Sequence, residues 1–213
     1  MALRANALAT IAQLQTHVSG ISDADATLAI DAASSLIERL CNRTFQRATV
    51  TERVAGFGRQ KLSLSRRPVE SVTSITRNGS VLDSTTYRIE DAETGLIQND
   101  SGWPNTGVML DIARPMVLPG SELRDHIVVY VGGYYLPNDA VPDAGTYPLA
   151  QPLPSVLVEA CLAVATSVYR ARGEDHSIES ETVGNASVSY AKGSRKLVSD
   201  FVEQMLSDFK ALA

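Results

Sequence analysis

The sequence of residues 22–41 is SDADATLAIDAASSLIERLC, and this stretch decides the first part of the fold. Ser22 followed by Asp23 and Asp25 is a capping-box-like start with acids in the first helical turn. Apolar side chains then recur with a period of 3.6 residues to about Asn42. They are Leu28, Ile30, Ala33, Leu36, Ile37, Leu40 and Cys41. The pattern predicts an amphipathic helix.

A second helical pattern precedes this one, from about Ala5 to Val18, with apolar side chains at Leu8, Ile11, Leu14 and Val18. Gly20 ends it. Because the link between the two patterns is short, the two helices are predicted to form a hairpin.

The pattern changes after Phe45, where short β-type runs replace the helical spacing. They occupy residues 49–51, 61–64, 69–76, 86–89, 107–112 and 127–131. Asn78-Gly79 is the strongest hairpin signal, because both residues tolerate a positive φ in a type I′ turn. Six short strands within about ninety residues are typical of a small antiparallel β-sandwich or barrel.

Helical patterns return at the C-terminal end, after a Pro-rich stretch from Tyr134 to Pro154. Residues 155–172 are apolar around most of the helical circumference, which predicts the central buried helix of the helical layer. Residues 174–193 are polar and are expected to form an exposed loop or hairpin. The last helix is expected from about Arg195 to Leu212.

These segments together predict an α+β protein: a helical bundle, made of the N-terminal hairpin and two C-terminal helices, with an inserted antiparallel β-sandwich or barrel. The helical domain is expected to comprise residues 1–45 and 152–213, the β insert residues 46–137, and the Pro-rich connector residues 138–151.

The net charge of −5 is unevenly distributed. From Arg43 to Arg77, eight Lys and Arg residues face only two acids, whereas residues 78–213 carry nine basic and eighteen acidic residues. Such a division suits head-to-tail repetition or docking on an oppositely charged partner, and equally a solvated surface of mixed sign. No apolar run is long enough to span a bilayer, so a soluble protein made in a cytoplasm is expected. Cys41 and Cys161 are predicted to be buried free thiols.

The sequence carries no recognisable catalytic or metal-binding constellation, so neither an enzyme nor a cofactor or metal site is expected. His17, His126 and His176 have no second ligand at metal-binding spacing, and each is predicted to be a surface histidine. The residues alone leave two functional hypotheses open. One is a nucleic-acid-binding accessory protein that uses the basic zone of residues 43–77. The other is a small enzyme with an unfamiliar site around Glu159 or His126, where Glu159 either pairs with an arginine or faces outward.

Five segments, taken in order, carry a resemblance to a known family. They are the helix at 25–43, the strand pair around Pro68-Val69 at 62–72, the strand end VYVGGY at 129–134, the Ala-rich helix at 153–170, and the segment at 178–190 before the last helix. In this order they resemble the head–tail connector (adaptor) proteins of tailed bacteriophages, the neck ring that binds below the portal.

The resemblance implies a structural virion protein located in the neck, at the head–tail interface, and assembled in the cytoplasm of a bacterial host. It implies a ring, commonly of twelve copies, that binds the portal protein, extends the DNA channel and docks a downstream stopper or tail-completion protein. DNA would pass through without specific recognition, and an acidic lumen would suit such sliding.

Two surfaces are the candidate interaction sites. An apolar face on the last helix, Phe201, Met205, Phe209 and Leu212, is the expected interface with the portal or another partner. A basic zone, Arg53, Arg59, Arg66 and Arg67, is the expected inter-subunit contact.

Overall fold

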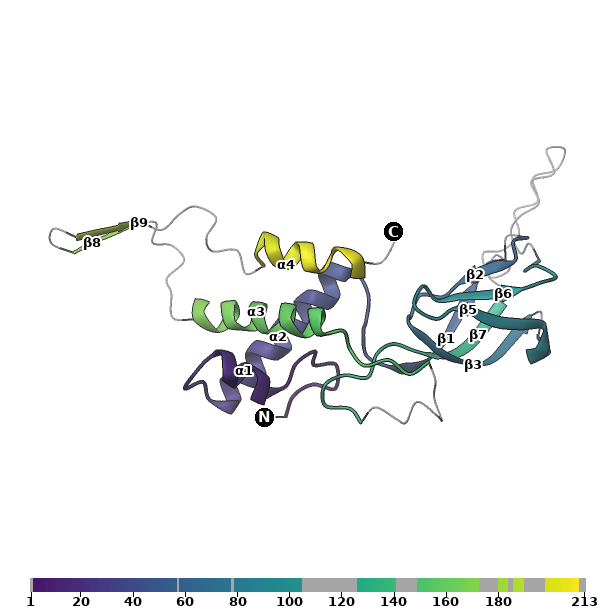
Figure 1. The fold of residues 1–213 in the computed structure, drawn as a ribbon, viewed down its shortest axis with the longest axis horizontal. Coiled ribbons are helices and arrows are strands. Elements are labelled where there is room, and N and C mark those ends of the chain that lie inside the picture. Colours follow the sequence, from purple (N-terminus) through teal and green to yellow (C-terminus); the bar gives the residue numbers. More distant parts are fainter. Residues whose placement is uncertain are drawn as a thin grey trace. The chain divides into compact units, whose positions relative to one another are not determined.

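A computed structural model describes residues 2–56, 58–77, 79–104, 126–140, 149–172, 180–183, 186–189 and 198–210. Within this part of the chain it contains four α-helices and antiparallel sheets, which confirms the predicted α+β class (Figure 1). The chain divides into two compact units. The helical unit comprises residues 1–43, 136–138 and 153–213, and the β unit comprises residues 44–135 and 139–152.

The first helix, α1, runs from Ile11 to His17 and is shorter than the predicted Ala5–Val18. Its start is fixed by a capping box: the Thr10 hydroxyl accepts from the Gln13 amide, and the Gln13 side chain accepts from the Thr10 amide at 2.8 Å. Leu8 is nevertheless buried, and its amide donates to Ser34 Oγ at 3.0 Å. The apolar residue that looked like the first turn of the helix therefore packs from an irregular segment.

The second helix, α2, runs from Asp23 to Cys41, as predicted. The Ser22 hydroxyl caps its first turn by accepting from the Asp25 amide at 3.1 Å. Asn42 ends the helix in the left-handed conformation with φ of 49°, which Asn adopts more readily than most residues.

The third helix, α3, runs from Ser155 to Ala171 and packs against α1, α2 and α4. This confirms its predicted central position. Its buried residues are Leu157, Ala160, Cys161, Leu162, Val164 and Ala165.

Helix α4 runs only from Asp200 to Met205 and is followed by a 3₁₀ turn, η2, at Ser207–Phe209. The prediction that one helix begins near Arg195 was wrong about the start, because Ser199 caps α4 by accepting from the Val202 amide at 3.3 Å. Strands β8 (Ser180–Val183) and β9 (Ala186–Ser189) pair as an antiparallel hairpin, one of the two forms expected for this segment.

The β unit contains a four-stranded sheet in the order β1-β7-β3-β4 and a three-stranded sheet in the order β2-β6-β5. The strands are β1 (Ala48–Val54), β2 (Lys61–Ser63), β3 (Val69–Arg77), β4 (Ser80–Val81), β5 (Tyr87–Asp91), β6 (Leu96–Asn99) and β7 (His126–Gly132), with a 3₁₀ turn, η1, at Ser84–Thr86. Strands β4 and β6 were not predicted, and the predicted run at 107–112 lies outside the described residues.

The two sheets share one hydrophobic core. Leu62 and Ile97 from the three-stranded sheet belong to the same buried cluster as Ile75, Val128 and Tyr130 from the four-stranded sheet. Trp103, the single tryptophan of the chain, is buried in this cluster. Arg77 pairs with Ser80, which confirms the hairpin predicted at Asn78-Gly79. Gly79 has the positive φ, 78°, that such a turn requires.

Candidate functional site

The apolar stripe of α4 divides between core and surface. Val202 and Leu206, 3% and 1% exposed, face inward, whereas Phe201 is 69% exposed and has the highest exposure among the large apolar side chains of the described chain. Met205 and Phe209 are half-buried, and Leu212 lies outside the described residues. Among the three predicted interface residues that the structure describes, Phe201 is therefore the one that a partner can reach most completely.

Two acidic side chains lie on the same helix as Phe201. Asp200 and Glu203 lie in the first turn of α4, where carboxylates favourably face the positive end of the helix dipole, and both are exposed. Helix α4 consequently exposes one aromatic ring and two acidic side chains.

A shallow groove of about 400 Å³ lies elsewhere on the helical unit, between the N-terminal segment and α2. Its lining residues are Ala2, Arg4, Leu28, Asp31, Ala32 and Ser35. Leu28 is 44% exposed, because it faces away from the buried side of α2 that carries Ile30, Ala33 and Ile37. The Arg4 amide donates to Asp31 Oδ1 at 3.2 Å, which holds the N-terminal segment against the helix.

The basic zone of residues 43–77 is partly neutralised inside the β unit. Arg47 makes a bidentate ion pair with Glu70, with Nε–Oε2 and Nη2–Oε1 distances of 2.7 and 2.8 Å. Tyr135 donates to Glu70 Oε2 at 3.2 Å, and the guanidinium of Arg47 lies 5.0 Å from the Tyr135 ring centre. The hydrogen bonds from Arg47 lower the pKa of the Glu70 carboxyl. Sequence reasoning missed this pair, which links the approach to β1 with β3.

A second polar network is centred on the buried Tyr130 of β7. The Tyr130 hydroxyl donates to Glu52 Oε2 at 2.7 Å and accepts from the Arg66 amide at 2.9 Å. The same Glu52 oxygen accepts from the Ser65 amide and hydroxyl at 3.1 and 2.9 Å. Burial, together with the neighbouring Glu52 carboxylate, raises the pKa of Tyr130 to about 12. This network ties the loop between β2 and β3 to the four-stranded sheet.

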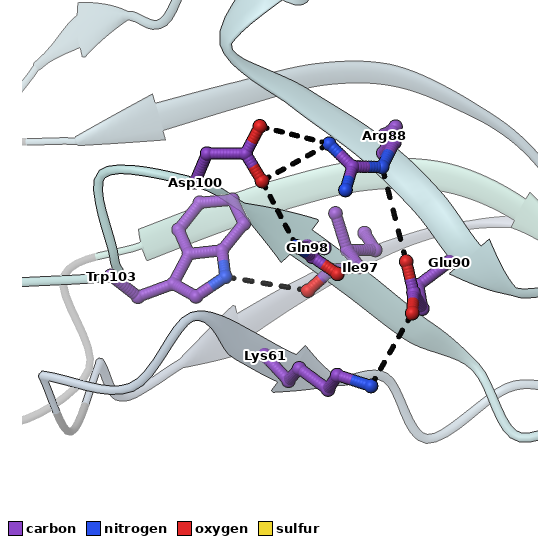
Figure 2. A network of polar contacts seen from close by, with 7 residues as sticks. All are labelled: Lys61, Arg88, Glu90, Ile97, Gln98, Asp100 and Trp103. Atoms are coloured by element: carbon purple, nitrogen blue, oxygen red, sulfur yellow. Dashed lines mark hydrogen bonds and ion pairs between the residues drawn. The ribbon is translucent and has the colours of Figure 1, made fainter.

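The outer face of the three-stranded sheet carries a chain of ion pairs (Figure 2). Lys61 lies 3.4 Å from Glu90, Arg88 lies 3.8 Å from the other Glu90 oxygen, and Arg88 also pairs with Asp100 at 3.0 Å. Register explains the grouping, because Lys61 and Arg88 both pair with Gln98 across the sheet. Lys61 is thus a further basic residue of the zone with an acidic neighbour.

The four arginines predicted for an inter-subunit contact therefore differ in availability. Arg53 and Arg59 are exposed, whereas Arg66 and Arg67 are half-buried. Arg66 Nη1 donates to the Gln46 carbonyl at 2.6 Å. A surface contact can use Arg53 and Arg59 fully, and the effective positive charge of the zone is smaller than its sequence count.

Steric contacts explain why the VYVGGY segment has glycine at positions 132 and 133. A Cβ on Gly132 would lie 2.4 Å from the Arg66 carbonyl oxygen, and one on Gly133 would lie 2.5 Å from the Gln46 carbonyl oxygen. Gly133 also has a φ of 104°, which disfavours other residues. Beside it, the Tyr134 amide donates to the Phe45 carbonyl at 2.7 Å. Residues 132–134 are therefore a point at which the backbones of three chain segments pack closely together.

The histidines and Glu159, which the sequence analysis considered for metal binding or catalysis, do not all lie where they were predicted. His126 is fully buried with its ring 5.5 Å from the Trp103 ring in an edge-to-face contact, so the prediction of a surface histidine was wrong. The cause is that β7 begins inside the shared core. His17 is exposed as predicted, and His176 lies outside the described residues. Glu159 faces outward, which was one of its two predicted placements.

The two cysteines are free and buried, as predicted. Among the described residues, no group of three or more His, Cys, Asp and Glu side chains is arranged to hold a metal ion. No helix in that part of the chain has the length and apolar character needed to cross a membrane.

Comparison with known proteins identifies the family. The model of the family "Head completion protein" matches residues 9–116, which is half of the chain. A solved structure of the neck of an empty GTA particle, computed with C6 symmetry, contains a chain that matches all of this chain and 94% of its own length. The TM-score is 0.51 and the sequence identity 15%, so this likeness concerns the fold. No curated protein is significantly similar in sequence. The predicted resemblance to a phage neck family is confirmed, and the chain belongs to the head completion protein family.

Proposed function

We propose that this protein is a structural component of the neck of a tailed phage or phage-like particle, where it forms a ring under the portal, extends the DNA channel and docks the next neck or tail protein. The observation that carries the proposal is the family match over residues 9–116. The fold similarity over the full chain to a protein of a GTA-particle neck supports it. In this proposal the protein acts through assembly and catalyses no reaction.

A ring of twelve copies is the proposed assembly. The C6 symmetry of the neck structure with the similar fold is compatible with any ring whose copy number is a multiple of six. A closed ring requires two different complementary surfaces on each copy. The helical unit and the β unit both offer candidates.

The outer side of α4, with Phe201, Met205, Phe209 and Leu212, is the proposed docking surface for an adjoining neck component. The exposure of Phe201 supports this role, because solvent-exposed aromatic residues are frequent anchors of protein interfaces. Arg53 and Arg59 are the members of the proposed inter-subunit zone that are exposed enough to meet acidic residues of a neighbouring copy.

The experiment that tests the neck function is binding to the portal ring from the same genome. The protein is mixed with purified portal rings, sedimented, and imaged in negative stain. The expected result is an added tier of density with the symmetry of the portal. Absence of association at high concentration and low salt would contradict the proposal.

The nucleic-acid alternative is tested on the same preparation by titrating double-stranded DNA at several salt concentrations. The neck function predicts weak binding without sequence preference. Tight binding with a steep salt dependence, lost in Arg53→Gln/Arg59→Gln, would instead favour the accessory-protein alternative. Arg170→Gln, which removes an exposed charge from α3, is the matched control.

A further inference from the structure

The histidine that begins β7 is enclosed in the core of the β unit. His126 is fully buried, and its ring lies 5.5 Å from the ring of Trp103 in an edge-to-face contact. The backbone of Gly56 covers another side, because a Cβ built on Gly56 would lie 2.8 Å from His126 Cε1. The imidazole therefore has no contact with bulk water and little room to move.

The two neighbouring strands place one apolar and one cationic side chain beside His126. In the register of the four-stranded sheet, His126 lies opposite Val54 of β1 on one side and opposite Arg77 of β3 on the other. Directly opposed residues of antiparallel strands point to the same face of the sheet. Val54 packs on the hydrophobic core, whereas Arg77 has a buried Nε that makes no hydrogen bond. Within the described part of the chain, the cation beside the imidazole forms no ion pair.

The other titratable groups that the described elements bring near this site are Tyr87, Glu52 and Arg59. The ring of Tyr87 lies 6.5 Å from that of Trp103, and burial raises the pKa of the Tyr87 hydroxyl, which is therefore neutral below pH 10.0. The carboxylate of Glu52 accepts from the Tyr130 hydroxyl at 2.7 Å. The Arg59 carbonyl accepts from the Trp103 amide at 2.8 Å, which brings a further positive residue to this end of the unit.

A proton on His126 would place a new charge where water cannot hydrate it and beside an existing cation. Burial and a like charge each disfavour the protonated imidazole. In an unfolded chain the imidazole takes up its proton at about pH 6.5. Below that pH the unfolded chain binds a proton that the folded site disfavours, so the folded state loses stability as the pH falls.

We propose that His126 makes the β unit sensitive to mild acid: the end of the unit formed by the start of β7, Gly56 and Trp103 opens when the imidazole is protonated. This inference goes beyond the proposed neck function and does not depend on it. The unfolding equilibrium constant should rise by up to about tenfold for each unit of pH below about 6.5. The contribution of Glu70 is lost only below pH 4.5, so the two effects occupy different ranges.

The test is urea unfolding of the full chain between about pH 5 and about pH 8, followed by the fluorescence of Trp103. His126→Gln and His126→Phe each remove the titrating group, and both should flatten the decline in stability below about pH 6.5. His17→Gln is the matched control, because it removes an exposed histidine, and it should keep the decline of the natural protein. A decline that is unchanged in the His126 variants would overturn the inference.

An NMR titration of the natural protein gives a second readout, which requires no substitution in the core. At about pH 5.5 the imidazole resonances of His126 in the folded protein should keep the shifts of the neutral form. Arg77→Gln should allow the folded protein to take up this proton at a higher pH. Arg53→Gln, which removes an exposed charge from the other face of β1, should not.

A protonated His126 in the folded protein at about pH 5.5 would contradict the proposal. Asp125→Asn then identifies the cause, because Asp125 precedes His126 in the sequence. A proton that is lost in this variant would show that a carboxylate stabilises the charged imidazole, which is the opposite of the proposed electrostatics.

Discussion

The hydroxyl of Tyr130 is the most informative single group to remove. Tyr130→Phe keeps the ring in the core of the β unit but deletes a donor to Glu52 and an acceptor for the Arg66 amide. The hydrogen bond to a charged group contributes about 1.5–3 kcal/mol and the backbone one about 1 kcal/mol. Because Glu52 keeps both Ser65 donors, the lower part of this range applies. The expected loss of unfolding free energy is about 2.5 kcal/mol.

The effect has a distinctive dependence on alkaline pH. The pKa of Tyr130 is raised to about 12 in the folded protein, from 10.0. Between these values the unfolded chain loses its phenolic proton first, so the stability due to Tyr130 falls as the pH rises through that window. One unit above the unfolded pKa the loss is about 1.4 kcal/mol. The stability gap between the natural protein and Tyr130→Phe should therefore shrink by about 1.4 kcal/mol between about pH 9 and about pH 11.

The assay is urea unfolding followed by the fluorescence of Trp103, which is buried in the same core as Tyr130. A loss of about 2.5 kcal/mol lowers the midpoint by about 1.2 M urea when the m-value is about 2 kcal/mol/M. Tyr87→Phe is the control, since the Tyr87 hydroxyl makes no hydrogen bond within the described chain. An unchanged midpoint in Tyr130→Phe, or a gap that stays constant up to about pH 11, would refute the reasoning.

Three further outcomes are expected. Gly133→Ala should cost about 3 kcal/mol or more in the same urea assay, because its Cβ meets the Gln46 carbonyl oxygen, whereas Gly58→Ala, with φ of 68° in open space, should cost about 1 kcal/mol. Glu70→Gln should cost about 2 kcal/mol at neutral pH. Since Arg47 lowers the pKa of Glu70, the stability that it adds is lost as the pH falls below 4.5, and the variant should show a flatter acid limb. Burial raises the pKa of the Cys161 thiol to about 11 and also raises that of Cys41, so a thiol reagent at about pH 8 should modify both only in denaturant. Similar effects of the two glycine variants, an acid limb unchanged in Glu70→Gln, or rapid thiol modification of the native protein would each contradict the corresponding expectation.

Local sequence signals predicted the elements whose causes are local. Helix α2 has its cap, its apolar period and its left-handed Asn42 within one continuous stretch, and its bounds were predicted closely. The start of α1 was misplaced although Thr10 and Gln13 have the spacing of a capping box. That signal was present in the sequence and outweighs the apolar period that continues upstream through Leu8.

The missed strands and polar networks have causes that are not local. Strand β4 has two residues and β6 has four, which is too short for an alternating pattern to stand out. Arg47 and Glu70 are 23 positions apart, and nothing in the sequence joins them before the sheet forms. The burial of His126 likewise depends on Trp103 from another part of the core.

The candidate surface could be predicted only in outline. The apolar stripe of the last helix identified Phe201, but only packing on α3 decides that Val202 and Leu206 face inward while Phe201 faces solvent. The groove was not predictable, because it depends on how Ala2 and Arg4 pack against α2, and these two residues precede every pattern in the sequence.

The backbone contact between Phe45 and Tyr134 has a consequence for how such a chain evolves. The Tyr134 amide bonds to the Phe45 carbonyl, and the Tyr135 amide bonds to the Gln151 carbonyl at 2.9 Å. The chain enters the β unit near Phe45, leaves it after Tyr135 and, after a short return, leaves it again near Gln151. These hydrogen bonds hold the three points next to one another. A domain whose entry and exit points lie close together can be inserted, exchanged or enlarged without distorting the protein that carries it. The β unit of this chain has the connectivity of a cassette, which recombination can replace while the helices continue to fold around the same core.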